Sequence, residues 1–464
     1  MEQNINVEDS HKGTFYSARQ AIRRHVTGGN VLIGATIIAF IVANVPSISG
    51  YYFDFWNQEV RLQIGDFNLF SHAGHPMTVL QFINDAMMAI FFFAIGLEIK
   101  REVLVGELSS MKQAILPIIA AIGGMVVPVA IFLMFGYGTD FVGGAAIPMA
   151  TDIAFSLGVL AMLKTRVPIS LKVFLTTLAV VDDIGGIIVI AVFYSSHIDV
   201  MMLIGAVLLL MFLLLGSRLK IQSKLFYMLV GTGVWYLFLN SGIHSTIAGV
   251  LVAFCIPATP LFEPRIYIKK IKQAISHFSS DDESKLDKRT MLSHDQMDWL
   301  KQVESASDKV ISPLQDLEDS LHHIVNFLII PIFAFANAGV VIENIDIASM
   351  FEGVSLAIIC GLLIGKMVGI FSFSWIAIKL KIAPMPYLSN WKMLASVAML
   401  GGIGFTVSMF IANLSFGAMG QDGALLLNQA KLGIIVGSIA SGVVGYVMLR
   451  ITLPKHLCEA SEED

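Results

Sequence analysis

The sequence predicts an all-α polytopic membrane protein with twelve transmembrane helices. Of its 464 residues, 56% are hydrophobic and 14% are charged, and the mean hydropathy is +0.75. An ordinary globular domain has about 45–50% apolar and about 25% charged residues. Two patterns along the chain support this class: a series of apolar segments of spanning length, and an alternation of basic residues between the loops that join them.

The apolar segments are identified by their length, because a helix needs about 20 residues to cross the hydrocarbon core of a bilayer. They lie at about 27–48, 77–98, 114–135, 141–162, 173–194, 200–217, 225–239, 243–260, 322–338, 353–378, 393–415 and 424–449. The seventh and eighth are short. The expected organisation is a tail over 1–26, spans one to eight over 27–262, a long loop over 263–316, spans nine to twelve over 317–450 and a tail over 451–464.

Lysine and arginine alternate between the connecting segments. The two tails and every second loop are basic, whereas the loops between them contain almost no basic residue apart from Arg61. Since cytoplasmic loops carry the excess of Lys and Arg, we expect both termini in the cytoplasm. The first 30 residues lack the pattern of a signal peptide, so we expect the N-terminus to be retained.

Composition excludes several other classes of function. The net charge of −5 and the scattered basic residues give no support to a nucleic-acid partner. Cys255, Cys360 and Cys458 form neither a CxxC pair nor an even-numbered set, so neither disulfides nor a zinc site are indicated.

A β-hairpin is predicted at about 58–70, in the first external loop. Residues 60–64 and 67–69 alternate in polarity on either side of Gly65-Asp66, and a two-residue loop that begins with glycine is typical of a tight hairpin. The hairpin could pair with its copy in a second subunit, which makes a homodimer the expected assembly, or it could be an isolated surface feature.

The segment 263–316 is the main break in composition. Three lysines at 269, 270 and 272 precede the polar run 279–284, and aliphatic residues are few. This segment is expected to be a cytoplasmic insertion that is partly helical. A solvated insertion is the favoured interpretation, and a regulatory or partner-binding role is the alternative.

Two spans are interrupted near their middle. The fourth contains Pro148, Thr151 and Asp152, and the eleventh contains three glycines within 401–404. Proline and glycine in these positions favour unwound chain, although a tolerated kink is the alternative. The interruptions fall in the middle members of spans three to five and ten to twelve, which start on opposite sides. The two triplets therefore read as inverted repeats whose broken helices cross at the midplane, where transporters bind their substrates.

Two adjacent carboxylates, Asp182 and Asp183, lie inside the apolar fifth span, and Lys366 lies inside the tenth. A charge at the centre of a membrane helix costs roughly 2.5–3.5 kcal/mol on insertion scales, so a pair of them indicates a partner or a task. Together the three residues predict a buried cation site. The alternative, charges that snorkel to a membrane surface, fits an Asp pair deep in a span poorly.

Six motifs stand out along the chain: Ala150-Thr-Asp-Ile-Ala-Phe155, Val181-Asp-Asp-Ile-Gly185, Leu363-Ile-Gly-Lys366, Gly401-Gly-Ile-Gly-Phe-Thr406, Phe333-Ala-Phe-Ala-Asn-Ala-Gly339 and Gly96-Leu-Glu-Ile-Lys-Arg-Glu102. With these motifs the chain resembles the NhaA family of sodium/proton antiporters, over nearly all of about 20–450 apart from the long loop. NhaA is itself one of the transporters on which the rule about inverted repeats rests. The resemblance implies electrogenic export of Na⁺, and of Li⁺, against protons in a bacterial inner membrane, with no cofactor and no nucleotide.

The resemblance also implies a set of site residues. Asp183 is expected as the main sodium ligand and proton carrier. Asp182 beside it is either a second titrating group or the ion-pair partner of Lys366. Thr151 and Asp152 are expected near the ion and at the positive ends of the crossed half-helices, and Lys366 at their negative ends. Whether Lys366 pairs directly with Asp182 stays open in the sequence.

Regulation by pH is implied for Glu98, Glu102, Glu318 and His322 at the cytoplasmic mouth and for His244 near the other end. Here the chain departs from the familiar pattern, with Asp319 in place of a histidine and His323 in place of a proline. Ordinary interfacial charges are the alternative interpretation. Asp85, near the outer end of the second span, is expected to line an entrance funnel or to be a surface anchor.

Other functions fit the residues less well. A proton-coupled transporter of a different cation or small solute is the main alternative, since broken helices alone would suit it. An intramembrane enzyme is disfavoured because Asp182-Asp183 is followed by Ile184-Gly-Gly186 and has no third aspartate. A simple channel would have little use for buried titratable carboxylates beside a lysine.

Overall fold

The computed structural model describes residues 28–454 with gaps at 65–66, 69, 73–74, 164–165, 196–197, 342–351 and 418 and over most of 261–309. The predicted N-terminal tail, most of the predicted C-terminal tail, the Gly65-Asp66 turn and most of the predicted 263–316 loop lie outside the described residues. The chain divides into two compact units. The first comprises Met1–Phe91, Glu102–Ser196 and Ile324–Asp464, and the second Phe92–Arg101 and His197–His323.

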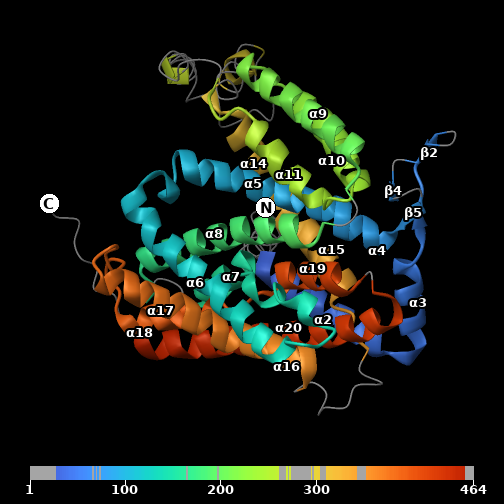
Figure 1. Ribbon diagram of the computed structural model, residues 1–464. Coiled ribbons are helices and arrows are strands. Elements are labelled where there is room, and N and C mark those ends of the chain that lie inside the picture. Colours follow the sequence, from blue (N-terminus) through green and yellow to red (C-terminus); the bar gives the residue numbers. More distant parts are fainter. Residues whose placement is uncertain are drawn as a thin grey trace, which may run out of the picture. The chain divides into compact units, whose positions relative to one another are not determined.

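Helices make up nearly all of the first unit (Figure 1). They are α2 Gly28–Asn44, α3 Pro46–Trp56, α4 Val79–Phe82, η1 Ile83–Met87, the two ends of α5 Met88–Leu104, η2 Glu107–Ser109, α6 Met111–Gly136, η3 Val142–Gly144, η4 Ile147–Met149, α7 Ile153–Met162, α8 Ile169–Phe193, η7 Val325–Ile329, α15 Ile330–Asn337, α16 Gly353–Cys360, η9 Gly361–Gly365, α17 Lys366–Lys379, α18 Trp391–Leu400, α19 Phe405–Phe416 and α20 Gly420–Thr452. Three of these, η1, η7 and η9, are π-helical.

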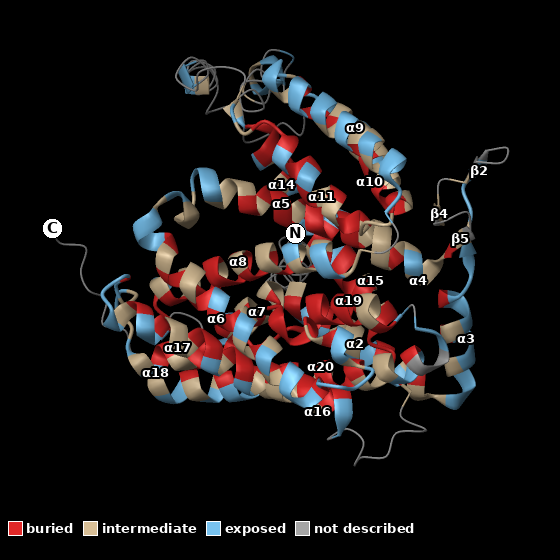
Figure 2. Cartoon of the chain, viewed as in Figure 1, coloured by how far each residue is buried: buried red, intermediate tan, exposed pale blue. Residues whose placement is uncertain are grey.

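The second unit contains the Phe92–Arg101 part of α5 together with α9 Val200–Arg218, α10 Lys224–Ser241, α11 Ser245–Cys255 and α14 Pro313–Ile324 up to His323. Most of the apolar side chains of α9 are exposed, so the helix is largely pale blue in Figure 2. An apolar helix with its aliphatic side chains exposed suits lipid as its surroundings.

The helical membrane architecture predicted from the sequence is confirmed. Within the described residues, eight helices are long and apolar enough to cross a bilayer, and two bent pairs bring the number to as many as ten. The bent pairs are α2 with α3, at 112°, and α18 with α19, at 45°. At the seventh and eighth predicted spans lie α10 and the 11-residue α11. The count of twelve and the inverted repeats stay predictions.

A small antiparallel sheet precedes the second span. Strands β2 Gln63–Ile64 and β3 Phe67–Asn68 pair with Gln63 opposite Asn68 and Ile64 opposite Phe67, which confirms the predicted hairpin next to its turn. Val60, expected in the same strand as Ile64, pairs with Met77 instead. The sequence did not predict the three-stranded sheet beside it, of order β1 Glu59–Val60, β5 His75–Thr78 and β4 Ser71–His72. The second predicted span, at about 77–98, corresponds to the helical stretch Val79–Leu104, which begins where Thr78 ends β5 and caps the helix that follows.

Close packing of α6 against α17 sets the position of the tenth span (Figure 1). A Cβ added to Gly123 would lie 2.4 Å from the Gly369 carbonyl oxygen, and one added to Gly365 would lie 2.7 Å from the Cα of Pro128. Small residues let membrane helices approach closely. These glycines therefore bring Lys366, directly after Gly365, against α6.

Candidate functional site

The first interruption lies between η4 and α7. The chain is extended from Ala150 to Asp152, and α7 starts at Ile153. Pro148 lies within the short η4 turn, where its fixed φ and missing N–H are tolerated. The Asp152 side chain caps α7 by accepting a hydrogen bond from the Phe155 N–H at 3.0 Å. The predicted break in the fourth span is present in the structure.

The second interruption separates α18 from α19 at residues 401–404. A Cβ on Gly402 would lie 2.2 Å from the Leu362 carbonyl oxygen, and one on Gly404 would lie 3.0 Å from the Ala150 carbonyl oxygen. Only glycine allows the backbone this close to its neighbours. The predicted break in the eleventh span is present too.

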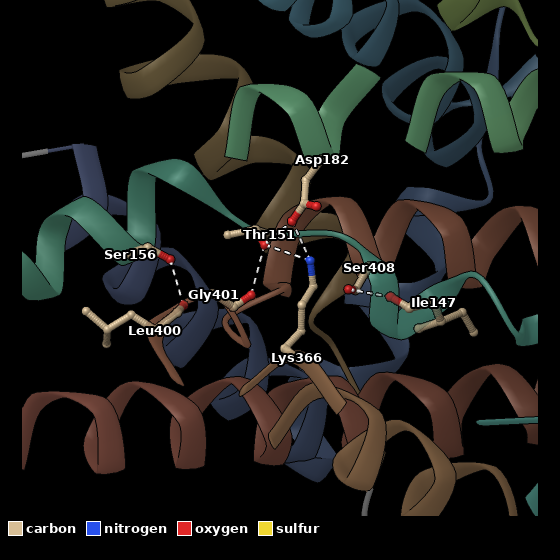
Figure 3. A network of polar contacts seen from close by, with 8 residues as sticks. All are labelled: Ile147, Thr151, Ser156, Asp182, Lys366, Leu400, Gly401 and Ser408. Carbon is tan, nitrogen blue, oxygen red and sulfur yellow. Dashed lines mark hydrogen bonds and ion pairs between the residues drawn. The ribbon is translucent and has the colours of Figure 1, made fainter. Parts of the chain in front are cut away.

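The two interruptions contact each other and exchange hydrogen bonds. The Asp152 N–H donates to the Ile403 carbonyl at 2.6 Å, and the Ser156 hydroxyl donates to the Leu400 carbonyl at 3.1 Å. In return, the Ser408 hydroxyl donates to the Ile147 carbonyl at 2.7 Å (Figure 3). Backbone groups that lack a helical partner must be satisfied inside a membrane protein. Each interruption therefore supplies hydrogen-bond partners for some of the backbone groups that the other leaves without a helical partner.

Asp152 serves both half-helices at once. Besides Phe155 of α7, its carboxylate accepts hydrogen bonds from the N–H of Thr406 at 3.1 Å and from the Thr406 hydroxyl at 2.7 Å, at the start of α19. A carboxylate stabilises the positive end of a helix. The predicted placement of Asp152 at the positive ends of the half-helices thus has a geometric basis. Since its two oxygens already accept three hydrogen bonds, the capping role is better supported than the role of ion ligand.

Asp182, Thr151 and Lys366 form one buried cluster between α8, the first interruption and α17 (Figure 3). The Lys366 ammonium donates to Oδ2 of Asp182 and, at 3.0 Å, to the Thr151 hydroxyl. The Thr151 hydroxyl has one hydrogen, so it donates either to Oδ2 of Asp182, at 2.7 Å, or to the Gly401 carbonyl, at 2.9 Å. The direct pair, which the sequence left open, is present in this structure.

One carboxylate oxygen of the cluster has no hydrogen-bond donor among the described residues. Oδ1 of Asp182 is buried and accepts no hydrogen bond from any residue that the structure describes. Asp183 follows on α8 and is 4% exposed, and its carboxylate interacts electrostatically with Lys366. Two carboxylates and one ammonium are thus buried together.

A π-helical turn places the lysine. The five residues of η9 end at Gly365, and α17 starts at Lys366. One extra residue in a helical turn changes the direction of the side chains that follow it, and such turns are frequent at functional sites. The residues of η9 look like ordinary helical sequence, so this signal could not be found beforehand.

The residues predicted to sense pH lie elsewhere. In the second unit, Glu318 of α14 accepts a hydrogen bond from the Arg101 guanidinium at 2.5 Å, and His322, one turn further, is exposed. Glu98 and His244, also in this unit, are half-buried. In the first unit, Glu102 accepts a hydrogen bond from the Glu107 N–H at 3.1 Å. The predicted funnel residue Asp85, in η1, is half-buried.

Three buried polar side chains were missed from the sequence. Thr406 and Ser408 bind the opposite interruption, and their spacing from Gly404 was the available signal. Lys431 of α20 is 6% exposed inside an apolar span. The rule that any charge inside a span deserves a functional hypothesis would have found it.

Broken helices that meet at a buried cluster of charges define this protein as a secondary transporter. The family model described as Na⁺/H⁺ antiporter 1 matches residues 19–449. The Na⁺/H⁺ antiporter NhaA of Phocaeicola vulgatus is 52% identical over 442 residues, which are 95% of this chain and 97% of the relative. That of Bacteroides fragilis is 53% identical over 433 residues, 93% of this chain and 97% of the relative.

A more distant relative, the Na⁺/H⁺ antiporter NhaA 2 of Syntrophotalea carbinolica, is 42% identical over 429 residues, 92% of this chain and 94% of the relative. The chain belongs to the Na⁺/H⁺ antiporter 1 family. The resemblance predicted from the motifs is confirmed. The protein is therefore an ion antiporter and not an enzyme, and its ions are substrates rather than cofactors.

Proposed function

We propose that this protein exchanges sodium for protons at the Asp182–Asp183 pair. The observation that carries the proposal is the buried ion pair between Asp182 and Lys366, with a second carboxylate beside it and Oδ1 of Asp182 unused. Carboxylate oxygens are hard ligands that suit a hard cation such as Na⁺, and they also bind protons. The two ions therefore compete for the same atoms.

Asp183 is the main ligand and carries one proton in each cycle. The second proton belongs to the coupled Asp182–Lys366 pair, because a cation that reaches Asp182 competes with the ammonium for its oxygens. Thr151, which hydrogen bonds to both partners, holds the pair in place when it is intact. Loss of two protons for each Na⁺ or Li⁺ bound makes the exchange electrogenic.

Alternating access in this proposal uses the two interruptions. Asp152 compensates the positive ends of α7 and α19, so the unwound chain stays stable while the half-helices shift. Transport is regulated by pH through Glu98, Glu102, Glu318, His322 and His244, and Asp85 guides the cation to the site.

The expected setting is the bacterial inner membrane. The chain crosses it twelve times, with inverted repeats in spans three to five and ten to twelve and with both termini in the cytoplasm. Two copies associate through the β2–β3 hairpin, because β2 and β3 pair only with each other within the described residues and an unpaired strand edge can accept a further strand. The partners are thus lipid and a second copy of the chain.

Everted membrane vesicles test this function. The vesicles are acidified by respiration, a pH dye is followed, and Na⁺, Li⁺ or K⁺ is added at a series of pH values. Alkalinisation on addition of Na⁺ or Li⁺, absent from Asp183→Asn vesicles with the same amount of protein, supports the proposal. A response to K⁺ alone favours a proton-coupled transporter of another cation, and no response to any of the three ions favours another solute.

A further inference from the structure

Three asparagine side chains from three separate helices form a hydrogen-bonded line in the first unit. Nδ2 of Asn337 donates to Oδ1 of Asn84 at 2.9 Å, and Nδ2 of Asn413 donates to Oδ1 of Asn337 at 2.9 Å. Asn84 lies in η1, Asn337 ends α15 and Asn413 lies in α19. Asn337 is 0% exposed. We call these three residues the asparagine chain.

The direction of the asparagine chain is fixed by the helices that carry it. Nδ2 of Asn337 also donates to the Phe333 carbonyl at 3.0 Å, and Nδ2 of Asn413 donates to the Met409 carbonyl at 2.8 Å. A backbone carbonyl can only accept a hydrogen bond. If the side-chain amide of Asn337 or Asn413 were rotated by 180°, its oxygen would face this carbonyl and the hydrogen bond would be lost. The asparagine chain therefore has a single arrangement.

One end of the asparagine chain leads to the ion site. Asn413 follows Thr406 on α19 by two helical turns, which places both side chains on one face of this half-helix. Thr406 donates two hydrogen bonds to Asp152, and the neighbouring Thr151 contacts Asp182 and Lys366. A shift of α19 along its axis would therefore move the groups that hold the Asp182 pair.

The other end leads to the second span. Asn84 precedes Asp85 in the π-helical turn η1, and α15 packs against both η1 and α19. A buried amide in a membrane helix needs a partner, and links of this kind join helices directly. The asparagine chain thus connects the half-helix at the ion site to the turn that contains Asp85.

We propose that Asn84, Asn337 and Asn413 are positioning residues for cation exchange, which fix α19 relative to η1 so that the buried cluster keeps its cation-binding geometry. The inference rests on the proposed function of the Asp182–Asp183 site. It differs from a purely structural role in one respect. The three side chains act as a single unit on cation affinity, because a break in either link releases the same half-helix.

A double-mutant cycle between the two ends tests this unit. Within the described residues, the hydrogen bonds that join Asn84 to Asn413 run through Asn337. Asn84→Leu, Asn413→Leu and the double variant are therefore compared in proteoliposomes for the apparent KM for Na⁺ and for the maximal rate. Each single variant is expected to raise the KM about 3-fold to 20-fold, the range that corresponds to one interhelical hydrogen bond in a membrane. The double variant is expected to raise it no further than the stronger single variant.

Multiplying effects in the double variant would overturn the inference, and so would a fall in maximal rate with an unchanged KM. The matched control is Asn240→Leu, because Asn240 donates to the Tyr236 carbonyl within its own helix and is expected to leave the KM unchanged. If the leucine variants do not fold, the same cycle is run with Asn84→Ser and Asn413→Ser. Exchange by the wild-type protein in the same vesicles separates failure of this inference from failure of the proposed function.

Discussion

The ammonium of Lys366 and the carboxylate of Asp182 form an ion pair in which neither side chain has any exposed surface. The only other hydrogen bond to Oδ2 of Asp182 within the described residues comes from Thr151. Removal of one partner leaves the other as an uncompensated buried charge, whereas removal of both takes away the two opposite charges together. The stability of the first unit therefore depends on whether the pair is intact, and its function depends on whether the pair can open.

Substitution of Lys366 alone tests how much the ion pair contributes to stability. Lys366→Ala is expected to lower the free energy of unfolding by about 3–5 kcal/mol, because Asp182 is left as a buried unpaired charge. Thermal unfolding in detergent measures the effect. The control is Lys379→Ala on the same helix, where the side chain is exposed. Equal melting temperatures for the Lys366→Ala and wild-type proteins would mean that the pair does not contribute to the fold.

Substitution of both partners separates folding from transport. Asp182→Asn combined with Lys366→Met removes both charges and is expected to recover most of the stability that Lys366→Ala loses. It is also expected to abolish coupled exchange, because a cation ligand and one titrating unit are gone. Melting temperature and vesicle exchange are measured on the same preparation. A double variant as unstable as Lys366→Ala would show that packing, rather than charge, explains the loss.

Asp183→Asn is the sharpest test of the ion ligand. The amide has nearly the volume of the carboxylate but neither binds a proton nor carries a charge. We expect the variant to fold, to insert and to lose Na⁺-dependent exchange completely. Purified protein in proteoliposomes gives the exchange rate, and Asp199→Asn, on an exposed helix cap outside the site, is the matched control. Wild-type rates for Asp183→Asn would assign the ion site elsewhere.

The sequence predicted the site well because its main signals are local. A charge inside an apolar run is visible without a structure, so Asp182, Asp183 and Lys366 were found directly. Both interruptions were found for a similar reason, since Pro148 and the glycines at 401–404 limit what the backbone can do there. The hairpin followed from its two-residue turn.

The remaining features depend on tertiary contacts and were not visible. Lys366 pairs with Asp182 only because distant segments of the chain approach each other. The same holds for Asp152, which accepts hydrogen bonds from Thr406 as well as from Phe155. The π-helical turns leave no pattern in the sequence, because the same residues would form an ordinary helix. Strand β5 was missed because its residues Met77 and Thr78 were counted in an apolar span, and β4, which pairs with β5, was missed with it.

Competition between sodium and protons predicts a definite pH dependence. As the pH falls, protons occupy the oxygens of Asp182 and Asp183, and the apparent KM for Na⁺ rises. Each competing proton raises the KM about tenfold per pH unit in the range where the site is protonated. Exchange measured at several Na⁺ concentrations and pH values gives this slope, and a slope near two protons favours electrogenic exchange. An apparent KM independent of pH would exclude a shared site.

The hydrogen bonds between Thr406 and Asp152 predict a small loss of stability for one variant and a larger loss for another. Thr406→Val removes one hydrogen bond to Asp152 and leaves the backbone one in place, so we expect a loss of about 1 kcal/mol in stability. Asp152→Ala removes the cap of α7 and both bonds to Thr406 and should cost more than twice as much. Thermal unfolding ranks the two variants. The reverse order would mean that Asp152 does not compensate the helix ends.

The ion pair between Arg101 and Glu318 links the proposed pH regulation to a specific contact. Arg101 is 37% exposed and Glu318 13%, so the pair contributes at most about 1 kcal/mol to stability, and Glu318→Gln should fold normally. Loss of a negative charge makes proton release from the neighbouring groups easier. If deprotonation of the proposed pH-sensing residues activates transport, the curve of exchange rate against pH moves to lower pH while the maximal rate is unchanged. Asp199→Asn, on an exposed helix cap at the start of α9, is the control, and an unshifted curve for Glu318→Gln would remove Glu318 from the proposed sensor.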